Sequence, residues 1–336
     1  MPEDTSQTLQ ESTLISRLGF GGSNLLGDKT RSQGLALLET AYAEGIRHFD
    51  VAPAYGYGDA EALVGEFARG KRDQITIATK FGLQPMKPVA GAKGLVSAVR
   101  KVMRTSPWVR GLVLRNAKSL IRRGQFDVKS ARLSLENSLR ALRTEVIDIY
   151  LLHECAPRDC SQELLDFLQQ AVSEGKIRHF GIGTEFSQAQ LVCSCCPEFA
   201  PIVQLKSSIL EPNLSSLRAA ESGRQSGTKK TITHGSFTVI PALHHRLNID
   251  AAWEDRWTGR LDLDLRDGET VARLILQQAL RANIQGTVLF QSGSLSRVAK
   301  NIRAAGAHRL SSTQLDDFER LGLELSQQPS PNGYIH

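Results

Sequence analysis

The sequence lacks the features that would place it in a membrane or on a secretory route. It contains no run of about 18 consecutive apolar residues, the length that a membrane-spanning helix needs. Its first thirteen residues are polar and acidic, unlike the basic and apolar start of a secretory signal. We therefore expect a cytoplasmic protein with no stable insertion into a membrane.

Cysteine is also scarce, and its arrangement argues against disulfide and metal chemistry. The chain has 336 residues and five cysteines, three of them at positions 193, 195 and 196. An odd number in a chain of this length is not typical of a disulfide framework. The paired C-x2-C spacing of structural zinc sites is missing. We expect no metal site and interpret the cysteines as small buried residues.

What the sequence does contain is a regular alternation of strand and helix patterns. Leu35, Leu38 and Tyr42 fall on one helical face, and the apolar run from Ile46 to Val51 follows directly. Strands are predicted near 18–22, 46–51, 75–79, 146–152, 179–183, 201–205, 231–233 and 286–290. Helices are predicted near 35–42, 60–68, 135–142, 164–172, 187–193, 213–220, 270–282 and 295–304.

This alternation predicts an α/β fold, a closed (β/α)8 TIM barrel, because parallel strands need helical crossovers that cover both faces of the sheet. An open doubly wound sheet is the alternative. Its dinucleotide fingerprint is missing, because Gly19-Phe-Gly21 lacks the third glycine and does not open a helix. We expect a single domain over 14–325, with flexible tails at 1–13 and 326–336. Large loop insertions at about 82–127 and 237–268 follow strands and should emerge at the C-terminal face, where barrels build active sites.

Three successive strands of this barrel end in ionisable residues. Asp50, Lys80 and His153 stand at these ends, and Tyr55 follows Asp50 by five positions. Charge at a buried strand end is costly unless it is paired, so we expect one polar cluster. Hydride addition to a carbonyl needs a proton donor for the alkoxide. A lysine beside a tyrosine hydroxyl lowers its pKa, an aspartate holds the lysine, and a histidine stabilises charge on the carbonyl oxygen.

Three segments carrying these residues resemble the signatures of the aldo-keto reductases and occur in that family's order. They are Phe49-Asp50-Val-Ala-Pro-Ala-Tyr55-Gly, Ala78-Thr79-Lys80-Phe-Gly and Asp148-Ile-Tyr-Leu-Leu-His153. The resemblance covers nearly the whole chain and implies a barrel that binds NADPH in extended form without a Rossmann motif. It also implies a catalytic tetrad of Asp50, Tyr55, Lys80 and His153, with Tyr55 as general acid. The short-chain dehydrogenases differ, since they need Tyr-x-x-x-Lys and none of the five tyrosines here has a lysine four residues on.

The resemblance further implies contacts to the nicotinamide end of the cofactor. Thr184 offers a hydroxyl where the family commonly has a serine, and Gln204 matches a glutamine that binds the carboxamide. His234 stands where an aromatic residue usually stacks on the nicotinamide ring. An imidazole can stack, and a surface histidine is the competing interpretation.

The adenosine end is expected in the last strand–helix unit. Ser292 and Arg297 suit phosphate oxygens near a helix start, and Asn301 matches a residue that contacts adenine in the family. Gln291 and Lys300 depart from the residues frequent there. The retained arginine favours NADPH, and NADH is the alternative cofactor.

The first insertion is strongly basic, with ten Lys and Arg residues and no Asp or Glu between 82 and 126. We expect this insertion to form a partly helical, solvated flap. The alternative is that its cations attract an anionic substrate, an acidic partner or an acidic membrane surface. We expect no nucleic-acid partner, because no recognisable module is present.

The leading hypothesis is an NADPH-dependent reductase of an aldehyde or ketone, or the reverse alcohol oxidation. The rival is an NADPH-binding regulatory or scaffold protein.

Overall fold

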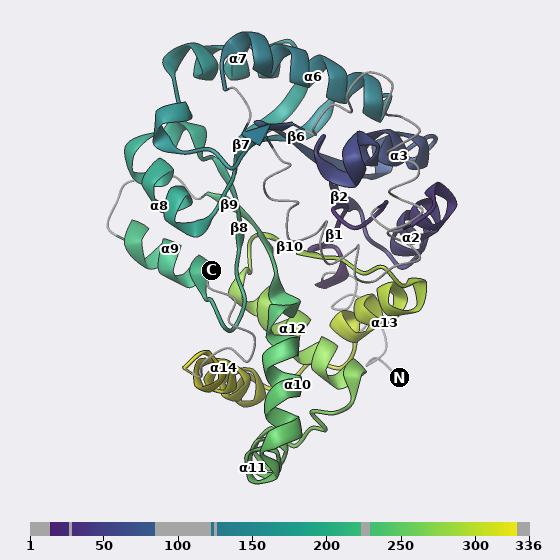
Figure 1. Ribbon diagram of the computed structural model, residues 1–336, viewed down its shortest axis with the longest axis vertical. Coiled ribbons are helices and arrows are strands. Elements are labelled where there is room, and N and C mark those ends of the chain that lie inside the picture. The colour runs from purple at the N-terminus through teal and green to yellow at the C-terminus, as the bar shows by residue number, and fades with distance from the viewer. Residues whose placement is uncertain (1–13, 27–28, 85–121, 124–125, 223–228, 328–336) are drawn as a thin grey trace, which may run out of the picture.

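The protein was described from a computed structural model that covers residues 14–26, 29–84, 122–123, 126–222 and 229–327. Eight parallel strands close into a barrel, each beside the next in chain order (Figure 1). They are β1 (Leu18–Gly21), β2 (His48–Asp50), β3 (Thr76–Phe81), β6 (Ile147–His153), β7 (Ile177–Gly183), β8 (Ile202–Lys206), β9 (Lys230–His234) and β10 (Thr287–Phe290). The predicted (β/α)8 barrel is thus confirmed.

Helices surround the strands on the outside of the barrel, and the helices at 240–249, 251–261 and 312–326 lie together at one end of the molecule (Figure 1). They are α2 (Arg31–Ala43), α3 (Ala60–Phe67), α6 (Val128–Leu142), α7 (Gln162–Ser173), α8 (Phe186–Cys195), α9 (Asn213–Glu221), α10 (Ile240–Ile249), α11 (Ala251–Leu261), α12 (Gly268–Ala282), α13 (Leu295–Gly306) and α14 (Ser312–Ser326). Several begin at a capping side chain: Thr30 forms a capping box before α2, and Asp127 accepts from the Ser130 amide before α6. Such caps satisfy backbone donors that the first helical turn leaves unpaired. None of the helices in the described ranges is long and apolar enough to cross a membrane.

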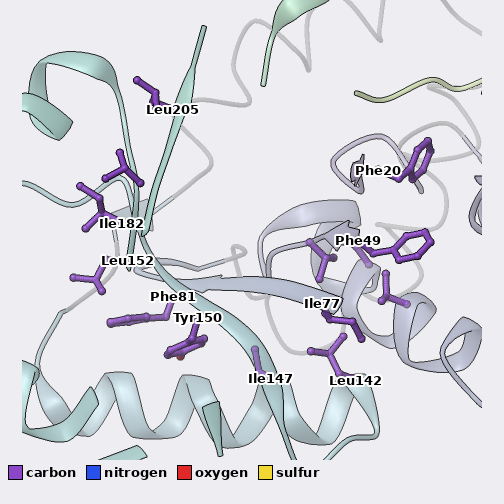
Figure 2. Close-up of a cluster of buried hydrophobic side chains, with 14 of the residues drawn as sticks. Phe20, Phe49, Ile77, Phe81, Leu142, Ile147, Tyr150, Leu152, Ile182 and Leu205 are labelled. Carbon is purple, nitrogen blue, oxygen red and sulfur yellow. The ribbon is translucent and has the colours of Figure 1, made fainter. Parts of the chain in front are cut away.

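The main core lies between the strands and this helical layer (Figure 2). Alternate residues of β3 and β6 point outward, so Phe81 stacks on Tyr150 with ring centroids 4.9 Å apart. Leu142 of α6 covers the neighbouring Ile77 and Ile147. A smaller apolar cluster, formed by Leu151, Ile202, Ile232 and Leu289, lies apart from this core.

The segment expected as a loop insertion at 237–268 is instead largely helical. It forms α10 and α11, and the side chains of Trp253, Trp257 and Leu261 follow one another at four-residue spacing on one buried face of α11. Both indole N–H groups donate to Glu324 of α14, at 2.9 and 3.1 Å. The tryptophans therefore anchor the segment on α14 and do not line the cavity described below.

The helix α14 was not expected from the sequence, although Ser311 caps it with a capping box. Its Leu315, Phe318, Leu321 and Leu325 are buried, and the last three join the same apolar cluster as the two tryptophans. This helix lies within the predicted domain range of 14–325, apart from its last residue. The range itself remains a prediction. Of the expected tails at 1–13 and 326–336, Ser326 is the last residue of α14, and residues 1–13 and 328–336 lie outside the described residues.

The basic insertion begins at a short hairpin directly after β3. Strand β4 (Leu83–Gln84) pairs antiparallel with β5 (Arg122–Arg123). Gly82 has φ +115°, and a Cβ atom there would lie 2.4 Å from the Phe126 ring, so only glycine fits this turn. Residues 85–121, which carry most of the basic side chains and the predicted flap, lie outside the described residues.

Candidate active site

The predicted catalytic residues meet at the C-terminal end of the barrel. Asp50 and His153 are the last residues of β2 and β6, Lys80 lies one residue before the end of β3, and Tyr55 opens a short 3-10 helix at Tyr55–Gly58. Asp50, Tyr55 and His153 line a cavity of about 1170 Å³. The register of parallel strands explains the meeting, because neighbouring strands end at the same face of the barrel.

Lys80 and Asp50 form a buried ion pair beneath this cavity. Lys80 is 1% exposed, and its Nζ donates to Asp50 Oδ1 at 2.5 Å and to the Val51 carbonyl at 3.1 Å. Burial alone would lower the pKa of Lys80, but Asp50 and Tyr55 outweigh it and the pKa is raised. The second Asp50 oxygen accepts from Gln204 Nε2 at 2.8 Å. The lysine is therefore held as a cation.

Tyr55 lies between this ion pair and His153. The Lys80 Nζ is 5.0 Å from the Tyr55 ring centroid, and the Tyr55 and His153 rings meet edge to face at 5.9 Å. Burial raises the pKa of Tyr55, and the charge of Lys80 offsets only part of this increase. Lys80 therefore lowers the pKa of Tyr55 as expected, but burial, which the sequence analysis did not consider, is the larger effect and the net pKa is raised. The hydroxyl of Tyr55 keeps its proton at neutral pH.

His153 is 8% exposed and faces the same cavity. Burial lowers its pKa well below the ordinary value, with further lowering by Lys80 and His234. Its Nδ1 atom has no hydrogen-bond partner among the residues that the structure describes. A buried ring nitrogen without a partner is uncommon.

The three residues expected at the nicotinamide line this cavity too, with part of their hydrogen-bonding capacity already used. The Thr184 hydroxyl donates to the Cys155 carbonyl at 3.0 Å, and the amide nitrogen of Gln204 donates to Asp50. Their oxygen atoms remain able to accept hydrogen bonds. His234, the last residue of β9, is exposed, and partial desolvation in the cavity together with Lys80 and Lys206 lowers its pKa to about 4.

The residues expected at the adenosine end line the other part of the same cavity. Ser294 caps α13 by accepting from the Arg297 amide, and the Ser292 hydroxyl accepts from the Ser294 amide at 3.2 Å. Arg297 is exposed on the first turn of α13, and Asn301 follows one turn later. The tertiary structure thus brings the six residues expected at the cofactor to one continuous cavity.

Ser236 belongs to this cavity as well, although the sequence analysis did not select it. It is 5% exposed, lines the cavity, and its Oγ has no partner within the described part of the chain. Gly235 precedes it in the left-handed region at φ +83°. The sequence feature that could have identified Ser236 is the Gly235-Ser236 pair, which follows the predicted strand at 231–233 by one residue. Ser236 and His153 thus each contribute a buried polar atom without a partner in the described part of the chain to the walls of this cavity.

The described residues contain no group of three His, Cys, Asp or Glu side chains that could hold a metal ion. The cysteines divide between buried and accessible positions, with Cys155 and Cys193 buried and Cys195 exposed. The interpretation of all five as buried residues is therefore wrong for Cys195, which stands at the end of α8.

Comparison with known proteins gives a consistent result. A family model described as the aldo/keto reductase family matches residues 17–223. The aldo-keto reductase YhdN of Bacillus subtilis is 29% identical over 184 residues, or 52% of this chain and 45% of that protein. The D-threo-aldose 1-dehydrogenase of a Pseudomonas species is 30% identical over 189 residues, 52% of each chain. The chain thus spans about half the length of the curated relatives it matches.

Solved structures share the whole fold at lower sequence identity. An aldo-keto reductase from Bacillus halodurans in its holo form superposes with a TM-score of 0.65 at 19% identity, over 91% of each chain. An aldo-keto reductase from Klebsiella pneumoniae in complex with NADPH gives 0.60 at 21% identity, again over 91% of each chain. These similarities show that the chain shares the barrel fold of the two solved structures.

Proposed function

Because the chain belongs to the aldo/keto reductase family, we propose that it reduces an aldehyde or ketone to an alcohol with NADPH, or catalyses the reverse oxidation. One observation carries the proposal. A protonated tyrosine, Tyr55, stands in a large cavity beside the buried Lys80–Asp50 ion pair and the neutral His153. This is an acid–base arrangement for adding a proton to an oxygen atom.

The cavity residues suit the nicotinamide cofactor. Arg297, with Ser292 and the capped start of α13, would hold the adenosine phosphate, and Asn301 the adenine. Thr184, Gln204 and His234 would contact the nicotinamide end. NADPH, when bound, supplies the hydride for the carbonyl carbon. The guanidinium of Arg297 favours the cofactor with the extra phosphate over NADH.

Proton delivery follows from the electrostatics of the four residues. Tyr55 holds its proton in the resting state because burial raises the pKa of its hydroxyl. As negative charge develops on the substrate oxygen, Tyr55 donates this proton, and the Lys80 cation stabilises the phenolate that forms. Asp50 keeps Lys80 charged and in place. His153 is neutral, so it can donate a hydrogen bond to the carbonyl oxygen without competing for the tyrosine proton.

The variant Tyr55→Phe tests this proposal. Aldehyde-dependent oxidation of NADPH should fall by about 10²- to 10⁴-fold, the usual contribution of a positioned general acid, while binding of NADPH measured by fluorescence is retained. Tyr42→Phe is the matched control, because the Tyr42 hydroxyl bonds to Gln74 outside the cavity. Undiminished turnover by Tyr55→Phe would refute the assignment of the acid.

The rival hypothesis is a regulatory or scaffold protein that binds NADPH without using it. The wild-type protein distinguishes the two when NADPH and NADH are titrated by fluorescence and the preferred cofactor is offered with a panel of aldehydes and ketones. Binding of NADPH with no oxidation by any carbonyl compound in the panel would favour the rival.

A further inference from the structure

An ion pair joins two helices at the end of the cavity that we assign to the adenosine. Glu269 stands on the first turn of α12, and its Oε1 atom lies 2.7 Å from the Nζ atom of Lys300 on α13. The two helices pack against each other, and both side chains belong to the cavity lining. More than half of each side chain is exposed, so both charges are accessible from solvent.

Lys300 is a second cation at the place proposed for the adenosine phosphate. It follows Arg297 by three positions on α13, so the two side chains are neighbours on one face of the helix, and both line the cavity. Glu269, and to a smaller extent the N-cap residue Asp267, raise the pKa of Lys300. Lys300 is therefore a cation at neutral pH, and its nearest counter-charge is Glu269.

The two members of this pair suit the two forms of the nicotinamide cofactor. NADPH carries a phosphate on the 2′-oxygen of the adenosine ribose, where NADH carries a hydroxyl. A cation accommodates the phosphate, whereas a carboxylate repels it and accepts a hydrogen bond from the 2′-hydroxyl. Lys300 therefore favours NADPH, and Glu269 favours NADH. As long as the pair is intact, Glu269 offsets the charge with which Lys300 would attract the phosphate.

We propose that the Glu269–Lys300 pair determines how strongly the protein prefers NADPH over NADH. With NADPH, Lys300 moves from Glu269 to the 2′-phosphate beside Arg297. With NADH, the pair stays intact and Glu269 accepts a hydrogen bond from the 2′-hydroxyl. This inference rests on the proposed function, because Arg297 and Asn301 place the adenosine at α13. Arg297 favours NADPH, and Glu269 makes the preference weaker than the arginine alone would make it.

Fluorescence titration of the full chain with NADPH and with NADH tests this inference through binding alone. Glu269→Gln removes the carboxylate at nearly constant volume. It should lower the Kd for NADPH about tenfold, the effect of one charge several ångströms from a phosphate dianion in a solvent-exposed site, and it should not lower the Kd for NADH. Lys300→Gln should raise the Kd for NADPH by a similar factor and leave the Kd for NADH nearly unchanged.

The titration with NADH separates a direct contact from a general effect of charge. Both cofactors carry the pyrophosphate, so a change in the overall charge of the cavity would move both dissociation constants in the same direction. The rest of the chain is identical in all variants, so its charge cancels in the comparison. Glu44→Gln is the matched control, because Glu44 pairs with Arg303 of the same helix α13 at 2.5 Å and neither residue lines the cavity. It should leave both dissociation constants unchanged.

Two fragments of the cofactors confine the measurement to the adenosine end. Adenosine 2′,5′-bisphosphate carries the 2′-phosphate and adenosine 5′-monophosphate the 2′-hydroxyl, and neither carries a nicotinamide. Calorimetric titration with both should give the same order of affinities among the variants as the whole cofactors give. If Glu269→Gln tightened the binding of NADPH but not that of the bisphosphate, the effect would not arise at the 2′-phosphate, and the inference would fail.

The double variant Glu269→Gln with Lys300→Gln removes both charges and keeps Arg297. It should change the ratio of the two dissociation constants less than either single variant does. An unchanged ratio in both single variants, with both cofactors still bound, would overturn the inference and leave the proposed function intact. A parallel gain in affinity for NADPH and NADH in Glu269→Gln would overturn it as well. If the wild type bound neither cofactor, the proposed function would fail, and this inference with it.

Discussion

Asp50→Asn should destabilise the protein strongly, because it leaves Lys80 as a buried cation without its counter-ion. Lys80 is 1% exposed, and without Asp50 it would keep the Val51 carbonyl at 3.1 Å and the neutral Tyr55 side chain as neighbours, neither of which carries a compensating charge. Removing one partner of a buried ion pair typically costs about 3–5 kcal/mol of unfolding free energy. Asparagine has nearly the same volume as aspartate, so packing changes little.

The loss of unfolding free energy in Asp50→Asn has an upper limit that depends on pH, because Lys80 can lose its proton and become neutral. From the ordinary pKa of 10.5, neutralising a lysine costs about 4.8 kcal/mol at pH 7 and about 2 kcal/mol at pH 9. In the wild type the folded pKa is raised, so the stability from this pair is fully present below pH 10.5 and is lost only as pH rises through the folded value. The destabilisation by Asp50→Asn should therefore shrink from pH 7 to pH 9.

Urea unfolding followed by circular dichroism at pH 7 and pH 9 measures this difference. The double variant Asp50→Asn with Lys80→Met removes the buried charge altogether, and it should recover most of the stability lost in the single variant. A penalty below about 1 kcal/mol at pH 7, or one that is the same at both pH values, would refute the view that a buried, charged Lys80 is stabilised by Asp50.

Three other perturbations follow from the structure. Gly82→Ala should lower stability by about 1–3 kcal/mol, measured as a urea midpoint, because φ is +115° and the new Cβ would meet Phe126; wild-type stability would contradict this. Trp257→Ala should cost about 3–5 kcal/mol through the lost contact with α14, while the fluorescence Kd for NADPH is unchanged. Burial lowers the pKa of His48, so its stabilising effect is present above pH 6.5 and is lost as pH falls. His48→Gln should reduce the acid slope of stability below pH 6.5 by up to about 1.4 kcal/mol per pH unit, and an unchanged slope would exclude His48.

Local patterns were sufficient to predict the barrel and the cluster at its end. The period of apolar residues identified eight strands and the helices between them, and parallel strands necessarily present their C-terminal ends at one face. Strand order alone therefore predicts that Asp50, Lys80 and His153 lie together. The predicted strand boundaries were less accurate: β3 extends to Phe81, so Lys80 lies within the strand and not after it.

Features that depend on contacts distant in sequence could not be predicted in this way. Helix α11 has its apolar residues at four-residue spacing, but the polar residues between them made the segment resemble a loop in the sequence. Its packing depends on α14, which is distant in sequence and supplies Glu324 as the acceptor for both indole N–H groups. Ser236 was not selected from the sequence because its distinguishing property is a buried hydroxyl without a hydrogen-bond partner among the described residues. A local sequence pattern does not encode such burial.

The sequence by itself determined which chemical groups stand at the strand ends, because residue type and strand order are local properties of the chain. Only the tertiary structure decided how these groups behave. Burial, a property of the assembled barrel, raises the pKa of Tyr55 against the effect of Lys80, reversing the direction expected from the lysine alone. The tertiary structure also placed Glu154, the residue after His153, in the lining of the cavity, with a left-handed backbone whose amide bonds to the end of β7.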